Sequence, residues 1–189
     1  MNKEVYKKIL AAREKKNENL KHASFEMETS THFPVLMKAV RMTMGEGPVL
    51  EVGSGLFSTP LLHWMCFESG RELITCERYL HYMDFAQKFR TASHAVLHVP
   101  DMRGVDFLNR HFSVVFIDHT PKKPRTRGDD ALLFKDTADY VVLHDAGADA
   151  KEKYGYAQLY PYFKYRYDFT GAVPHTTVLS NFKDLSVFS

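Results

Sequence analysis

Two glycines follow a short apolar run in residues 49–63, VLEVGSGLFSTPLLH, and the residues around them could hold a small molecule. Glycine permits backbone angles, and a close approach of backbone to ligand, that a side chain would block. Such a turn can hold a ligand above a sheet, or it can simply join a strand to a helix. The residues in question are Glu51, Gly53, Ser54, Gly55 and Ser58.

Acidic residues follow the next two apolar runs. Glu77, with Arg78 beside it, lies about 20 residues past the glycines, a position from which a carboxylate can accept hydrogen bonds from ribose hydroxyls. Asp101 and Met102 follow the third run, where the edge and face of an adenine could be contacted. Together with the glycine turn, these residues predict an adenosyl-type ligand.

Two adenosyl cofactors compete for this site. A dinucleotide needs the pattern G-x-G-x-x-G before a helix, and here Ser58 occupies the third glycine position. Glu51 would place a negative charge near the turn, which disfavours a diphosphate and suits a ligand with an ammonium and a sulfonium group. The residues therefore favour S-adenosylmethionine over NAD.

Two further apolar runs end in an aspartate–histidine pair, Asp118-His119 and His144-Asp145. A histidine with its ordinary pKa of about 6.5 can act as a general base at neutral pH, with an aspartate orienting it. Alternatively, the group could hold a divalent cation such as Mg²⁺, with Asp118 and Asp145 as candidate ligands. The residues could also be polar groups that link loops, and Asp118 could contact the amino-acid portion of the cofactor.

A basic loop and a tyrosine-rich stretch supply candidates for binding a substrate. Lys122, Arg125 and Arg127 lie within TPKKPRTRGDD and could clamp an anionic acceptor, or they could be a solvated charge run. Tyr154 and Tyr156 begin a stretch of six tyrosines that could form an aromatic wall or pack at the edge of the core.

The elements that must position these residues alternate between strands and helices. Continuous apolar runs at residues 48–52, 72–76, 94–99, 113–118 and 139–145 are typical of parallel strands buried on both faces. Helices are expected between them, at 58–69, 79–92, 104–111 and 128–137. Near residue 34 another helix is expected, with Ser30 or Thr31 as its cap. Two β-rich pieces, 163–169 and 175–182, predict a C-terminal antiparallel hairpin. The fold class is therefore α/β: a Rossmann-like open sheet of five parallel strands plus this hairpin, with helices on both faces.

Length and composition indicate the number of domains, the kinds of partner and the location to expect. The 189 residues predict one domain, 1–189, with residues 1–45 as an N-terminal helical cap that could act as a lid or an oligomer contact. A hydrophobic content of 44% argues against disorder, and a net charge of +2 gives little support for a nucleic-acid partner. Two cysteines, no signal peptide and no long apolar run favour a cytoplasmic protein that does not enter a membrane.

The chain resembles the class I S-adenosylmethionine-dependent methyltransferases over roughly residues 48–182. LEVGSG looks like the first motif of that family, ITCE the second and VPDM the adenine-side motif, while VVFIDH and VVLHD resemble the fourth- and fifth-strand motifs of small O-methyltransferase-like members. The resemblance extends to a poorly characterised subgroup. It implies a methyltransferase that uses S-adenosylmethionine.

The sequence thus predicts methylation of a small or peptide-linked acceptor at oxygen or nitrogen, with an anionic acceptor as one option. His119, His144 and Asp145 are the candidates for catalysis. One alternative is a non-catalytic module that binds an adenosyl cofactor or a partner. Another is an enzyme that uses NAD or a nucleotide sugar.

Overall fold

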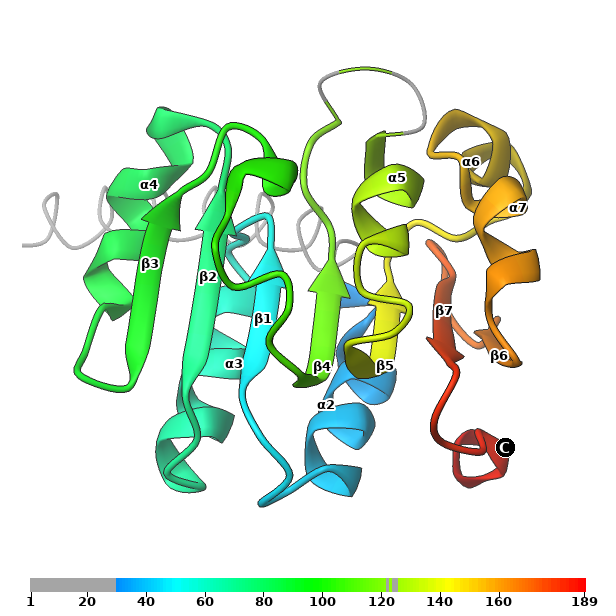
Figure 1. Cartoon of the computed structure of the whole chain (residues 1–189), viewed down its shortest axis with the longest axis horizontal. Helices are drawn as coiled ribbons and strands as arrows, with labels where there is room; N and C mark the ends of the chain where they lie inside the picture. Colours follow the sequence, from blue (N-terminus) through cyan, green and yellow to red (C-terminus); the bar gives the residue numbers. More distant parts are fainter. Residues whose placement is uncertain (1–29, 122, 124–125) are drawn as a thin grey trace, which may run out of the picture.

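The computed structural model describes residues 30–121, 123 and 126–189, and a seven-stranded sheet runs through their centre (Figure 1). The strand order is β3-β2-β1-β4-β5-β7-β6. Its first five strands along the chain all pair in parallel, which confirms the predicted α/β sheet. They are β1 (Val49–Val52), β2 (Leu73–Glu77), β3 (His94–His98), β4 (Phe112–Ile117) and β5 (Ala138–Leu143).

The predicted C-terminal hairpin is also present. It consists of β6 (Tyr165–Phe169) and β7 (Thr176–Ser180), which pair in antiparallel fashion. Strand β7 pairs with β5 as well, so β6 forms the outer edge of the sheet. The order of the strands along the chain changes direction between β1 and β4, and in open α/β sheets ligands bind above such a point.

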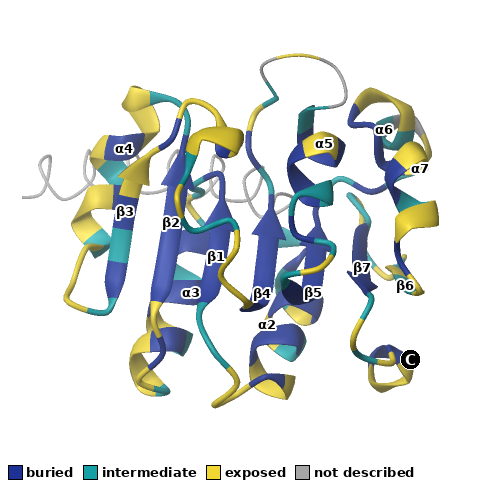
Figure 2. Cartoon of the chain, in the orientation of Figure 1, coloured by how far each residue is buried: buried dark blue, intermediate teal, exposed yellow. Residues whose placement is uncertain are grey.

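Apolar side chains cover both faces of the sheet, and Figure 2 shows the central strands buried between the helices. On one face, α2 (Phe33–Met42) and α3 (Ser58–Glu68) pack against side chains such as Val114 and Val142. On the other face, α5 (Thr126–Leu132) and α7 (Tyr156–Leu159) pack against Val115 and Val141. Neighbouring residues of one strand therefore serve opposite cores, which explains why these runs are apolar without alternation.

Two smaller helices complete the layers. Helix α4 (Leu80–Ala86) lies against β2 and β3, and α6 (Ala148–Lys153) precedes α7 beyond the end of β5. In the described part of the chain, none of the helices has the length and apolar character that a membrane crossing requires.

Two local predictions were wrong. Residues 104–111 form no α-helix: a 3₁₀ turn at Met102–Gly104 leads into irregular turns, from which Phe107 and Leu108 pack against the core. Neither Ser30 nor Thr31 caps α2, because the helix begins at Phe33 with His32 at its N-cap position. The Thr31 hydroxyl donates instead to the carbonyl of Pro174.

The predicted N-terminal cap spans both described and undescribed parts of the chain. Residues 1–29 lie outside the described residues. Within 30–45, helix α2 packs on the sheet and contacts β4.

Candidate functional site

The register of the parallel strands brings four predicted residues into one row. Val52 pairs with Cys76 on β2 and with Ile117 on β4, and Ile117 pairs with Leu143 on β5. The residues that follow these positions are Glu77, Gly53, Asp118 and His144, and they share the carboxyl edge of the sheet. The sequence placed these residues at strand ends, and the sheet brings those ends together.

The glycine turn packs directly on the end of β4. Gly53 has φ +99°, and a Cβ at this position would lie 2.4 Å from Cα of His119. The Gly53 N–H donates to the carbonyl of Cys76 at 2.8 Å, which ties the turn to β2 as well. Only glycine fits both the backbone angle and the contact.

Glu51 lies beneath this turn and supports it. Its side chain is completely buried, and its carboxylate accepts hydrogen bonds from the hydroxyls of Thr59 (3.0 Å) and Thr75 (2.7 Å). The Thr59 hydroxyl in turn accepts the Gly55 N–H at 3.0 Å. Burial raises the pKa of Glu51 to about 7, against the hydrogen bonds of Ser58, Thr75 and Thr59, which lower it. The carboxylate therefore holds the loop from below in this structure and does not face the open edge of the sheet.

Behind Glu51 runs a chain of buried polar groups that the sequence analysis missed. Thr75 donates to Glu51, so the ring nitrogen Nε2 of His94, 2.9 Å from the Thr75 hydroxyl, must be the donor there. Burial and the neighbouring His63 lower the pKa of His94 to about 4, so its ring is neutral at pH 7 and Nδ1 is an acceptor. His63 Nδ1, at 3.0 Å, is then the donor to that nitrogen. In each of these hydrogen bonds, the acceptor is the group nearer to Glu51.

Glu77, the predicted ribose acid, closes over the same turn from β2. Its Oε2 accepts both the N–H and the hydroxyl of Ser54 at 2.8 Å, and its Oε1 accepts the Tyr79 N–H at 2.7 Å. The side chain is 3% exposed. A ribose hydroxyl could take the place of the Ser54 hydroxyl on Oε2, while the backbone bonds keep the carboxylate oriented.

Asp101, one of the two predicted adenine-side residues, borders a cavity of about 170 Å³ that Arg78 also lines. Arg78 reaches across from β2, donates to the carbonyl of Pro100 at 3.1 Å, and lies 3.3 Å from Asp130 on α5. Asp101 is exposed and accepts the Arg103 N–H at 3.0 Å, whereas Met102 is buried in the core. Arg78 and Asp101 therefore line the cavity, and Met102 supports the structure beside it.

His119 faces α5 and not the row of strand ends. Its Nε2 lies 3.0 Å from Asp130 Oδ2, and its ring is buried. Asp130, which the sequence analysis did not single out, is thus shared by His119 and Arg78. The two predicted catalytic histidines therefore have different partners.

His144 lies at the end of β5 with both ring nitrogens engaged. Its Nδ1 is 3.2 Å from Asp118 Oδ2, and its Nε2 is 3.1 Å from the Thr31 hydroxyl. The single hydroxyl proton of Thr31 goes to the carbonyl of Pro174 at 2.7 Å, so His144 Nε2 must be the donor. A histidine that donates from both nitrogens is an imidazolium.

The electrostatics agree with that protonation state. Burial alone would lower the pKa of His144, but the hydrogen bond and charge of Asp118, joined by Asp145, raise the pKa above its ordinary value. For Asp118, burial opposes ionisation, yet His144 and Arg127 lower its pKa. This imidazolium carries no lone pair with which to accept a proton.

Arg127 bridges the ends of β4 and β5. Its guanidinium lies 3.1 Å from Asp118 Oδ1 and 2.9 Å from Asp145 Oδ2, and it stacks on the ring of Tyr154 at 4.2 Å. The arginine is buried and also donates to the carbonyl of His119. Three residues were predicted to clamp an anion. Of these, Arg127 binds partners within the protein, and Lys122 and Arg125 lie outside the described residues.

The carboxylates predicted as Mg²⁺ ligands do not fit that role here. Asp118 and Asp145 share the guanidinium of Arg127, which already supplies the positive charge between them. Among the described residues, His32, Asp118 and His144 have ligand atoms within 4.8 Å of one another.

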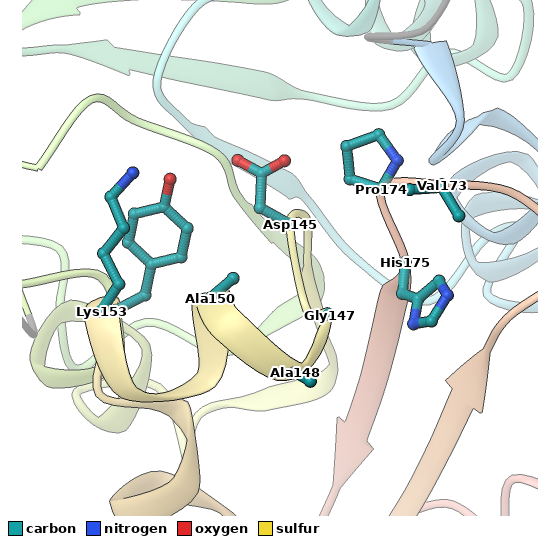
Figure 3. Close-up of a pocket in the computed structure, with 9 residues that line it drawn as sticks. Asp145, Gly147, Ala148, Ala150, Lys153, Val173, Pro174 and His175 are labelled. Carbon is teal, nitrogen blue, oxygen red and sulfur yellow. The ribbon is translucent and has the colours of Figure 1, made fainter.

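A larger cavity, of about 510 Å³, opens beyond the end of β5. Asp145 and Tyr154 line it, together with residues of α6 and of the turn between β6 and β7 (Figure 3). Tyr156, in contrast, is fully buried and donates its hydroxyl to the carbonyl of His144 at 3.0 Å. Of the two predicted tyrosines, only Tyr154 reaches a cavity, and Tyr156 holds the end of β5.

Comparison with known proteins identifies the fold. No protein-family model and no curated protein matches the chain. Among solved structures, human methyltransferase-like protein 13 in complex with SAH is similar, with a TM-score of 0.59 and 16% identity over 83% of this chain and 84% of that one. For a proposed caffeoyl-CoA O-methyltransferase from Staphylococcus aureus, the TM-score is 0.58 and the identity 12%, over 93% of this chain and 98% of that one. For a proposed O-methyltransferase from Klebsiella pneumoniae, the TM-score is 0.58 and the identity 16%, over 80% of this chain and 79% of that one.

These similarities and the strand order define the protein's architecture: it has the Rossmann-like fold of the class I S-adenosylmethionine-dependent methyltransferases. At such low identity the likeness concerns the fold. Its function must be argued from the site.

Proposed function

We propose that the protein is a methyltransferase that uses S-adenosylmethionine to methylate a small or peptide-linked acceptor at oxygen or nitrogen. The observation that supports this most is the row Glu77, Gly53 and Asp118 at the point where the strand order changes direction. In one structure with this fold, methyltransferase-like protein 13, the bound molecule is SAH, the demethylated form of that cofactor.

The residues present fit an adenosyl group. Glu77 would accept ribose hydroxyls, Arg78 and Asp101 would border the base, and Gly53 would let the backbone approach the ligand. Asp118, oriented by His144 and Arg127, would border the methionine end.

The cofactor would supply a methyl group bonded to a positively charged sulfur. Transfer of that group would break the carbon–sulfur bond with its electron pair left on sulfur, and the acceptor would give up one proton to solvent. Asp145 borders the larger cavity and could accept a hydrogen bond from the acceptor group. The chain's main contribution to rate would be alignment of the two groups.

The alternative, a module that binds the cofactor without turnover, has one observation in its favour. His144, the predicted base at the end of β5, has both nitrogens occupied by Asp118 and Thr31. An acceptor that must lose a proton before attack would find no neutral imidazole at this position.

Calorimetry with SAH tests the proposal, with NAD as the competing ligand. We expect SAH to bind in the micromolar range and NAD to show no heat. Replacing Glu77 by glutamine should weaken SAH at least about tenfold through the lost ribose bonds, whereas Glu68→Gln, an exposed acid on α3, should not. A folded protein that binds neither SAH nor S-adenosylmethionine would overturn the proposal. Binding without methyl transfer to any acceptor would favour the non-catalytic alternative.

A further inference from the structure

The larger cavity carries charges that identify the kind of molecule it fits. It lies between α6 and the turn that joins β6 to β7. In Figure 3, Asp145 stands between Lys153 on one side and Val173 and Pro174 on the other.

One edge of the Asp145 carboxylate remains open to this cavity. Its Oδ2 is held by Arg127 at 2.9 Å, whereas its Oδ1 is 3.7 Å from the nearest His144 nitrogen, and the side chain is 27% exposed. Asp145 also has φ +55°, an unusual angle for a residue with a side chain. Strained angles of this kind concentrate at functional sites.

The charged residues at the cavity differ in whether they have partners. Asp118 and Asp145 are matched by Arg127 and by the His144 imidazolium. Lys153 makes no ion pair with the residues that the structure describes, and its amino group lies 5.0 Å from the centre of the Tyr154 ring. Among the described residues, the Lys153 amino group is therefore left to pair with an anion at the wall of the cavity.

The remaining lining is small and mostly apolar. Ala148, Ala150, Val173 and Pro174 leave room for a hydrocarbon body, and the volume of about 510 Å³ is in the range of small-molecule sites. A ligand that satisfies both the lysine and the aspartate needs an anionic group at one end and a hydrogen-bond donor at the other.

We propose that this cavity binds small hydroxy- or amino-carboxylic acids, with Lys153 pairing with the carboxylate and Asp145 accepting a hydrogen bond from the O–H or N–H. This inference rests on the proposed function, since it names the class of acceptor for the same site. It assigns to Lys153 the anion-binding role that was predicted for Lys122, Arg125 and Arg127.

Binding of 4-hydroxybenzoate and of 4-hydroxybenzamide, measured by calorimetry on the full chain with saturating SAH, tests the inference. The two probes differ in charge and hardly in shape. We expect the acid to bind at least about tenfold more tightly than the amide. Lys153→Gln should remove that preference, and Lys88→Gln, an exposed lysine beyond α4, should preserve it. Equal affinity for the two probes, binding of neither at millimolar concentration, or an unchanged preference in Lys153→Gln would overturn the inference.

The failure of this inference is distinguishable from that of the proposed function. If SAH binds and the acid is not preferred, the acceptor class is wrong and the cofactor assignment stands. If SAH does not bind but the acid binds through Lys153, measured then without SAH, the cavity is an anion site and the methyltransferase proposal fails.

Discussion

The hydroxyl of Thr75 lies 2.7 Å from Oε2 of Glu51, inside the core and directly below the glycine turn. Thr75 cannot donate to a second partner, and the ring of His94 donates to it in turn. The carboxylate is thus surrounded by donors, an arrangement suited to the ionised form, although burial favours the neutral one.

The stability of the fold should therefore depend on the titration of Glu51. Burial raises its pKa from 4.5 to about 7, so the folded state binds this proton more tightly than the unfolded state. The corresponding stability is present below pH 4.5 and is lost as the pH rises through 7, a change of about 3 kcal/mol for this shift. Unfolding in urea at pH 5 to 8 should show that Glu51→Gln lacks this loss.

The comparison uses the difference between variant and parent at each pH, because other groups titrate in both proteins. Gln158→Asn, which changes no titrating group at an exposed position on α7, should give a constant difference. A constant difference for Glu51→Gln as well would contradict the raised pKa.

Gly53 should be intolerant of even the smallest side chain. An alanine there would combine φ +99° with a Cβ 2.4 Å from the backbone of His119, so we expect a loss of at least about 2 kcal/mol in unfolding free energy. Gly45→Ala is the matched control: its φ is +85°, but nothing lies within 4 Å of the added Cβ. Urea unfolding of both variants separates the clash from the backbone angle. A Gly53→Ala protein as stable as Gly45→Ala would show that the turn can move.

Arg127 should be a strong contributor to stability among the ion pairs of the described region. It is buried and serves Asp118 and Asp145 together, and removal of one partner of a buried pair typically costs about 3 to 5 kcal/mol. Arg127→Gln should lower the unfolding free energy accordingly. Arg110→Gln breaks an exposed pair with Glu72 and should cost less than about 1 kcal/mol. Similar losses in the two variants would mean that the buried bridge is not formed in solution.

Much of the fold follows from the sequence because the strands are buried on both faces. The five continuous apolar runs with helices between them fit a parallel sheet covered on both faces, and the terminal β-rich pieces fit a hairpin. The same reasoning gave a wrong helix at residues 104–111. Phe107 and Leu108 pack on the core from a turn, and two adjacent apolar residues do not require a helix.

The site was predictable in position and less so in orientation. Register alone places Gly53, Glu77, Asp118 and His144 together once the strand order is known. The direction in which Glu51 points depends on the alternation of side chains along β1, which turns it toward Thr75 on the neighbouring strand.

Ion pairs and hydrogen bonds between residues distant in the sequence could not be predicted from it. The bridge from Arg127 to Asp145, the sharing of Asp130 and the bond from His144 to Thr31 join elements that only the folded chain brings together. No local spacing encodes these pairs, and the basic loop therefore looked like a clamp for an external anion.

The protonation state of His144 decides what the end of β5 can do in catalysis. Because both ring nitrogens donate, to Asp118 and to Thr31, the ring should remain an imidazolium at pH 7. Long-range ¹H–¹⁵N correlation spectra distinguish the charged ring from either neutral tautomer. In Asp118→Asn the main cause that raises the pKa of His144 is gone while burial, which lowers it, remains, so the pKa should fall relative to the parent protein. Asp84→Asn, at an exposed position on α4, should leave the titration of His144 unchanged.

A neutral His144 at pH 7 in the parent protein would contradict the assignment and restore this residue as a general base. A charged ring would leave Asp145, which lines the larger cavity, as the candidate to accept a hydrogen bond from the acceptor.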